Sequence, residues 1–118
     1  MLARGCASGD ATVSFVTPDD VLPRYAELVL AVVEQVPSGL VLTYGDVAEL
    51  IGEGGPRQVG AVLSRYGGGV AWWRVLRADG TPAPQVRERA LAAYAREGTP
   101  LRVDRSRVDL QRARWDGH

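Results

Sequence analysis

Apolar residues between positions 23 and 36 recur at intervals of three and four, which is the period of an amphipathic helix. The members of this stripe are Tyr25, Leu28, Val29, Val32, Val33 and Val36. The pattern predicts a helix from Pro23 to about Gln35, ended by a turn at 37–39, where the sequence reads Pro-Ser-Gly. The apolar stretch Leu40–Leu42 then predicts either a short strand or an extended connector.

Two shorter helices are expected after this stretch. Thr43 is suited to cap a helix that runs to about Ile51, because its hydroxyl can accept a hydrogen bond from a free backbone N–H. The glycine-rich stretch 52–55 ends it, and Pro56 can begin a second helix to about Tyr66. We expect these helices to bury Val47, Ala48, Leu50, Ile51, Val59, Val62 and Leu63. Two helices joined by a tight glycine turn form a helix-turn-helix pattern.

The remaining segments complete one small domain. Residues 78–81 predict a turn, residues 84–97 a further helix, and the last twenty residues a short extended pair or a wrapped tail. The buried stripe expected on the helix is Val86, Ala90, Leu91, Tyr94 and Ala95. Residues 1–20 lack any period and predict a flexible tail. The fold class expected for 21–118 is therefore mainly α, a small winged-helix or helix-turn-helix-like domain with short extended segments.

Composition excludes several classes of protein. The 118 residues suffice for a single core, and the lone cysteine, Cys6, has no partner for an intrachain disulfide. No stretch approaches the roughly 20 apolar residues of a membrane span, and the first residues lack the apolar run of a secretory signal. No cluster of His and Cys indicates a metal, and we expect no cofactor. These features favour a cytoplasmic protein that does not bind membranes.

The net charge is zero, but the charges are unevenly distributed. Residues 1–53 carry a net charge of −6, residues 54–78 carry +4 without any acid, and residues 79–118 carry +2. All fourteen cations are arginines, a bias that suits phosphate binding and aromatic stacking but that a GC-rich genome also produces. The acid-free block is the more useful signal, because it contains the motifs described next.

Three motifs occur in a fixed order along the chain. They are Thr43-Tyr44-Gly45-Asp46-Val47-Ala48, Pro56-Arg57-Gln58-Val59-Gly60 and Val70-Ala71-Trp72-Trp73-Arg74-Val75. Two adjacent tryptophans point in different directions in any regular backbone. We therefore do not expect both of them to be ordinary core residues. Over residues 23–98 the chain resembles the DNA-binding domain of the O6-alkylguanine-DNA alkyltransferase family. Trp72 stands where those enzymes carry the reactive cysteine and Trp73 where they carry a histidine, so the chain is most similar to the alkyltransferase-like proteins.

The resemblance implies that the helix-turn-helix enters the minor groove and that a guanine rotates out of the duplex. It assigns DNA contacts to Tyr44, Arg57, Gly60, Arg65 and Arg74, and a lesion pocket to Trp72 and Trp73. Arg57 would replace the departed base, Tyr44 would press on a backbone phosphate, and Trp72 would stack on the extruded base. Arg65 and Arg77 would contact phosphates, while Glu97 is expected to be a surface or bracing residue.

The predicted function is a non-enzymatic sensor, without a catalytic residue, that binds duplex DNA containing O6-alkylguanine and flags it for nucleotide-excision repair. An indole cannot accept an alkyl group as a thiolate does. The expected partners are alkylated double-stranded DNA and nucleotide-excision repair proteins, for a monomer associated with the nucleoid. Three alternatives stay open: a helix-turn-helix regulator without base flipping, an active transferase, and a protein-interaction domain that has lost DNA binding.

Overall fold

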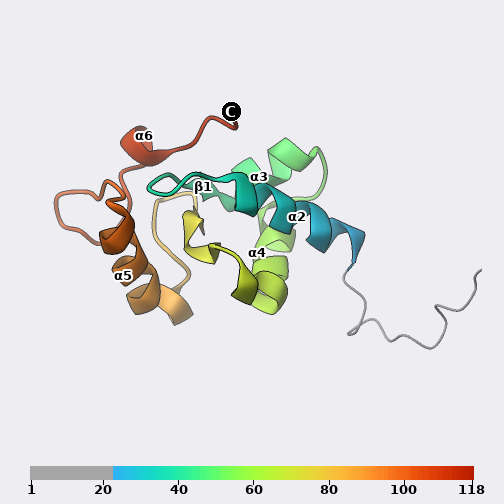
Figure 1. The fold of residues 1–118 in the computed structure, drawn as a ribbon, viewed down its shortest axis with the longest axis horizontal. Coiled ribbons are helices and arrows are strands. Elements are labelled where there is room, and N and C mark those ends of the chain that lie inside the picture. Colours follow the sequence, from blue (N-terminus) through green and yellow to red (C-terminus); the bar gives the residue numbers. More distant parts are fainter. Residues whose placement is uncertain (1–22) are drawn as a thin grey trace, which may run out of the picture.

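The computed structural model describes residues 23–118, and these residues are mainly helical (Figure 1). The α-helices are α2 (Arg24–Gln35), α3 (Tyr44–Ile51), α4 (Pro56–Tyr66), α5 (Arg87–Glu97) and α6 (Leu110–Ala113). Two short strands, β1 (Leu42–Thr43) and β2 (Val75–Leu76), pair in parallel. Single 3₁₀ turns cover η2 (Gly67–Gly69), η3 (Trp72–Arg74) and η4 (Pro84–Val86). The predicted fold class is confirmed, and the tail predicted for residues 1–20 lies outside the described residues.

The start of α3 is fixed by a reciprocal capping box. The Thr43 Oγ1 atom accepts the Asp46 backbone N–H at 3.0 Å, and Asp46 Oδ2 accepts the Thr43 backbone N–H at 3.0 Å. The predicted cap at Thr43 is therefore confirmed. The helix ends at Gly52, whose φ of +89° is a left-handed conformation that glycine adopts without steric cost.

Helices α3 and α4 form the predicted helix-turn-helix, with α2 packed against both. In the turn between them, the Tyr25 hydroxyl donates to the Glu53 carbonyl at 3.1 Å. The Gly55 N–H donates to Gln58 Oε1 at 2.8 Å, which satisfies one of the free donors at the start of α4. The turn is thus held by α2 on one side and by the first turn of α4 on the other.

The small sheet separates two clusters of buried side chains. Leu42 pairs with Val75 and Thr43 with Leu76. Because successive side chains of a strand point to opposite faces, Leu42 and Val75 enter one cluster and Leu76 enters the other. The first cluster lies among α2, α3 and α4, and the second lies between α5 and the C-terminal segment. Most of the first cluster thus comes from α2, α3 and α4 and most of the second from residues 90–113, while Val41 joins the second cluster and Trp115 packs against the first.

The C-terminal segment is a wrapped tail, one of the two forms that the sequence predicts. Val41 donates to the Ala113 carbonyl at 2.9 Å, and Trp115 donates to the Val41 carbonyl at 2.8 Å. Leu101 and Val108 form a single antiparallel bridge. These backbone hydrogen bonds place the tail beside β1 and bring Arg114 to Asp46.

Three details of the sequence prediction are wrong. Leu50 is 49% exposed, because the neighbouring α2 and α4 cover Val47 and Ala48 rather than the outer side of α3. Ala95 is exposed and Ala93 is buried in its place. The helix predicted over 84–97 consists of η4 followed by α5, since Val86 has non-helical backbone angles at the junction. Among the described residues, no helix is long and apolar enough to span a membrane.

Candidate nucleic-acid interface

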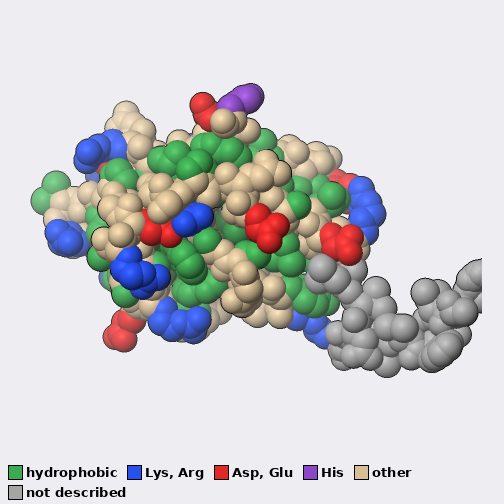
Figure 2. Space-filling view, in the orientation of Figure 1, with side chains coloured by type: hydrophobic (Ala, Val, Ile, Leu, Met, Phe, Trp, Pro, Cys, Tyr) green, Lys and Arg blue, Asp and Glu red, His purple; other side chains and the backbone are tan. Residues whose placement is uncertain are grey.

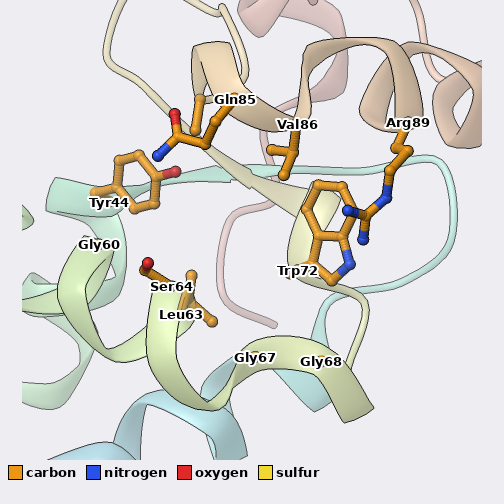
Figure 3. A pocket seen from close by; sticks show the side chains of 11 residues that line it. Tyr44, Gly60, Leu63, Ser64, Gly67, Gly68, Trp72, Gln85, Val86 and Arg89 are labelled. Atoms are coloured by element: carbon orange, nitrogen blue, oxygen red, sulfur yellow. The ribbon is translucent and has the colours of Figure 1, made fainter.

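A pocket of about 340 Å³ lies where the two halves of the domain meet (Figure 3). Its walls come from the start of α3, the second half of α4, η2, η3, and the η4–α5 segment. The lining residues are Tyr44, Gly60, Leu63, Ser64, Gly67, Gly68, Trp72, Ala83, Gln85, Val86 and Arg89. The size falls within the range of small-molecule sites, near its lower limit. The pocket therefore has room for a small planar group.

Trp72 forms one wall of this pocket. Its backbone N–H donates to the Val70 carbonyl at 2.8 Å, which fixes the turn that carries the indole. The ring packs against the second core cluster and meets the Trp73 ring edge-on, with centroids 5.5 Å apart and planes at 85°. Figure 3 shows the indole beside Val86 and Arg89, across the cavity from Tyr44 and Ser64. The ring is thus held from behind while the pocket remains open in front of it.

Trp73 does not line the pocket, so the prediction that it forms a pocket wall is corrected. Its Nε1–H donates to Glu97 Oε2 at 3.0 Å, and its carbonyl accepts the Tyr94 hydroxyl at 2.7 Å. Burial is the main reason why the pKa of Tyr94 lies well above its usual value, so this hydroxyl stays a donor. Two adjacent residues of a 3₁₀ turn point in different directions, and here only the first faces the cavity. Trp73 supports Trp72 from the α5 side.

Arg74 is directed into the protein, and its contact with DNA stays a prediction. Its Nε and Nη2 atoms donate to Glu97 at 3.1 and 2.6 Å, and Nη1 donates to the Val36 carbonyl at 2.9 Å. The side chains of Arg74 and Glu97 are only 18% and 11% exposed. This guanidinium therefore ties α2 and α5 to the turn that carries Trp72 and braces that turn.

Glu97 accepts hydrogen bonds from three parts of the chain. Besides Arg74 and Trp73, the Gly39 backbone N–H donates to its Oε1 at 3.1 Å. Burial by itself would raise the pKa of Glu97, but the hydrogen bonds from Arg74, Gly39 and Trp73 outweigh it and lower that pKa below its ordinary value. The carboxylate is thus ionised at neutral pH and braces the wall behind Trp72, as expected from the sequence.

Tyr44 and Gly60, which the sequence predicts as DNA contacts, both line the pocket. Tyr44 is the first residue of α3, and its ring packs against the first core cluster. Burial raises the pKa of the Tyr44 hydroxyl, and the positive charge of Arg77 opposes this rise. The hydroxyl is therefore neutral and can donate a hydrogen bond. A Cβ atom at Gly60 would meet nothing within 4 Å, so the glycine leaves open space on the pocket side of α4.

Arg57 and Arg65 are on the surface of α4 and do not line the pocket. Arg57 lies in the first turn of the helix, and Arg65 lies in its last turn with its guanidinium 5.7 Å from the centre of the Tyr66 ring. Figure 2 shows that several other basic side chains gather at the end of the molecule that carries α5. Contact of Arg57 and Arg65 with DNA stays a prediction.

Three polar lining residues were not found from the sequence, namely Ser64, Gln85 and Arg89. The Arg89 guanidinium lies 5.1 Å from the centre of the Trp72 ring. Four residues separate Gln85 from Arg89, a spacing that would place both on one face of the helix predicted over 84–97, although the structure has them in η4 and α5. That spacing was a usable signal, but the sequence alone does not say that this face meets Trp72.

The family model of the DNA-binding domain of 6-O-methylguanine DNA methyltransferase matches residues 24–99, which contain all three motifs and every residue of the pocket. The chain belongs to this family. The single cysteine of the chain is at position 6, outside the residues that the family model matches.

Several curated relatives carry the same name. The "DNA base-flipping protein" of Escherichia coli K12 is 39% identical over 98 residues, which cover 78% of this chain and 74% of that protein. The protein of that name from Vibrio parahaemolyticus is 29% identical, over 80% of this chain and 98% of its own length. Both are described by base flipping rather than by transfer of an alkyl group.

Solved structures of this family share the fold. The chain superposes on S. pombe Atl1 in complex with damaged DNA containing O6-carboxymethylguanine with a TM-score of 0.69, at 24% identity, covering 78% of this chain and 94% of that one. A second complex of the S. pombe protein with DNA gives a TM-score of 0.68. The helix-turn-helix fold predicted from the sequence is therefore confirmed.

Proposed function

We propose that this protein is a non-enzymatic sensor that binds duplex DNA containing O6-alkylguanine, rotates the lesion out of the stack and holds it against Trp72. The observation that carries this proposal is the Trp72 indole, which forms a wall of an open pocket. By the resemblance of the motifs, Trp72 stands where the family carries its nucleophile. An indole has no thiolate with which to accept an alkyl group. The pocket can therefore hold a base without reacting with it.

The energetics of base flipping are consistent with this arrangement. Extruding a nucleotide costs a few kcal/mol, and stacking a base on an aromatic ring returns about 1–3 kcal/mol. Tyr44 and Ser64 face Trp72 across the cavity and offer hydroxyl groups to a bound base (Figure 3). In this proposal Arg57, at the exposed start of α4, fills the gap that the base leaves in the duplex. The relatives named for base flipping support the proposal that the lesion is rotated out of the duplex.

The proposal extends to the cellular role. A protein that grips a lesion without repairing it is useful when it marks the site, so we infer that nucleotide-excision repair proteins are its downstream partners. A cytoplasmic monomer associated with the nucleoid fits this role. The S. pombe relative, whose structure contains damaged DNA, supports a lesion in double-stranded DNA as the primary partner.

The first prediction is that Trp72→Ala abolishes discrimination between lesion-containing and intact duplex. Removing the ring removes about 1–3 kcal/mol of stacking, which is a loss of roughly five- to 150-fold in affinity for the lesion. Fluorescence anisotropy with a duplex containing O6-methylguanine and the matched unmodified duplex measures this ratio. Trp72→Phe should retain part of the discrimination, and Leu50→Ala, on the exposed side of α3, should retain all of it.

Two outcomes would contradict the proposal. Equal affinity of the wild-type protein for both duplexes would instead support a helix-turn-helix regulator that does not flip bases. A mass increase of the protein by one methyl group after incubation with methylated DNA would make it a transferase. The wild-type protein is expected to keep its mass while binding the lesion.

A further inference from the structure

Among residues 23–118, Arg89 is the only charged side chain that lines the pocket. It lies in the first half of α5 with its guanidinium 5.1 Å from the centre of the Trp72 ring, and Figure 3 shows it extending from α5 to that ring. None of the lining residues is acidic, and the described part of the chain provides no salt-bridge partner for Arg89. A cation therefore stands at the stacking wall with its hydrogen-bond donors uncommitted.

This arrangement contrasts with Arg74, the neighbouring arginine on the other side of the tryptophan pair. The donors of Arg74 are used by Glu97 and by the Val36 carbonyl. The guanidinium of Arg89 lies over the Trp72 ring, an interaction that leaves its five N–H donors available in the plane. A guanidinium can stack on a ring and fork onto a carboxylate at the same time, because the two interactions use perpendicular directions.

The ligand that such a group recognises is an anion beside a stacked base. Hydrogen bonds between a guanidinium and a carboxylate are roughly twice as strong as those between neutral groups. A methyl group on O6 offers Arg89 no acceptor, whereas a carboxymethyl group carries two carboxylate oxygens three bonds from that oxygen. A backbone phosphate next to the flipped nucleotide is the other anion in reach of such a site, so the two sources have to be separated by experiment.

We propose that Arg89 is a specificity-determining residue that makes this pocket prefer O6-alkylguanines whose alkyl group ends in a carboxylate. The inference rests on the proposed function and deepens it, because it names the class of lesion. Gln85, one turn before Arg89 and on the same wall, offers an amide that can bind the same substituent. Charge, rather than the size of the adduct, is the property that the pocket reads.

The test compares three lesion duplexes of one sequence, which carry O6-carboxymethylguanine, O6-carbamoylmethylguanine or O6-methylguanine, with the matched unmodified duplex. The carbamoylmethyl adduct has almost the same size as the carboxymethyl adduct but no charge. Anisotropy titrations of the full-length protein should show about tenfold tighter binding of the charged adduct than of its neutral counterpart, the difference between a charge-assisted and a neutral hydrogen bond. Arg89→Gln should reduce this ratio to about one and leave the affinity for the methyl adduct within about threefold.

Arg87→Gln is the matched control, because Arg87 is exposed at the start of the same helix and does not line the pocket. It should leave the ratio unchanged. An equal loss of affinity for all three duplexes in Arg89→Gln would overturn the inference, since it would make Arg89 a phosphate contact. A wild-type ratio near one would overturn it as well while leaving lesion recognition intact. Failure to distinguish any adduct from undamaged DNA would overturn both this inference and the proposed function.

Discussion

Glu97 contributes most to positioning the candidate site although it does not line the pocket. One carboxylate accepts hydrogen bonds from Gly39, from Trp73 and from Arg74, and it is 11% exposed. These donors come from the turn after α2 and from η3, so Glu97 connects both to α5. The position of the Trp72 side chain therefore depends on Glu97, the last residue of α5.

We predict that Glu97→Ala lowers the free energy of unfolding by about 3 kcal/mol, because it leaves the Arg74 guanidinium largely buried without its carboxylate. Denaturant titration followed by tryptophan fluorescence measures this change. Glu88→Ala, an exposed position on the same helix, should change the stability by less than about 0.5 kcal/mol. Equal effects of the two substitutions would show that the Glu97 contacts are not stabilising.

The pH dependence of stability follows from the same carboxylate and from Asp46. For both groups burial opposes ionisation, but hydrogen bonds from Arg74 to Glu97 and from Arg114 to Asp46 contribute to a folded-state pKa below the ordinary values of 4.5 and 3.8. A lowered folded-state pKa adds stability that is complete above the ordinary value and is lost as the pH falls through the folded-state value. We predict constant stability from neutral pH to about pH 5 and a fall below it.

Unfolding titrations at a series of pH values check this prediction, with Glu97→Gln as the comparison. The variant cannot ionise at this position, so its stability should fall less between pH 5 and pH 3 than that of the wild-type protein. An identical acid-side slope in both proteins would mean that Glu97 is not responsible for the loss.

At the scale of elements, the turn that follows β2 is joined to the C-terminal segment at Gly80. Its φ is +88°, and the Val108 backbone N–H donates to its carbonyl at 2.9 Å. A Cβ atom at this position would lie 2.6 Å from the Val108 carbonyl oxygen. The close approach of two backbone segments therefore requires glycine here, in addition to the left-handed conformation.

Gly98, which ends α5, provides a matched comparison. Its φ is +71°, but a Cβ atom there would meet nothing within 4 Å. We predict that Gly98→Ala costs about 1 kcal/mol for the left-handed backbone, whereas Gly80→Ala costs about 2–4 kcal/mol because the steric clash is added. Thermal or denaturant unfolding of both variants measures the difference. Equal losses of stability in the two variants would mean that the segment around Val108 can move away from position 80 at no cost in free energy.

At the scale of the whole molecule, the zero net charge limits how strongly electrostatics can drive DNA binding. The acid-free segment 54–78 carries four arginines, of which Arg74 is used internally. Roughly three phosphate contacts would give a slope of about −3 for the logarithm of affinity against the logarithm of salt concentration. Lesion binding should therefore depend on salt less steeply than for strongly basic DNA-binding proteins.

Arg77→Ala is predicted to reduce the magnitude of this slope by about 1, because it removes one phosphate contact. Arg24→Ala is the control, since Arg24 pairs with Glu53 on the surface of α2 and should leave the slope unchanged. Titrations of the O6-methylguanine duplex between 50 and about 200 mM salt measure both slopes. If Arg77→Ala leaves the slope unchanged, Arg77 does not contact a phosphate in the complex.

The sequence by itself determined the local elements and the family of this protein. The apolar period of α2, the cap at Thr43 and the proline that begins α4 act within one or two helical turns, so they can be read without the rest of the chain. The order of the three motifs was also sufficient to predict the family, which the family model over residues 24–99 confirms.

Only the tertiary structure decided what each side chain of the site faces. Trp73 and Arg74 lie inward because Glu97, 24 and 23 residues further along the chain, supplies their partner. Arg89 reaches the pocket because α5 packs against η3. Such contacts join residues that are distant in sequence, and their free energy depends on how whole helices pack, which no local pattern encodes.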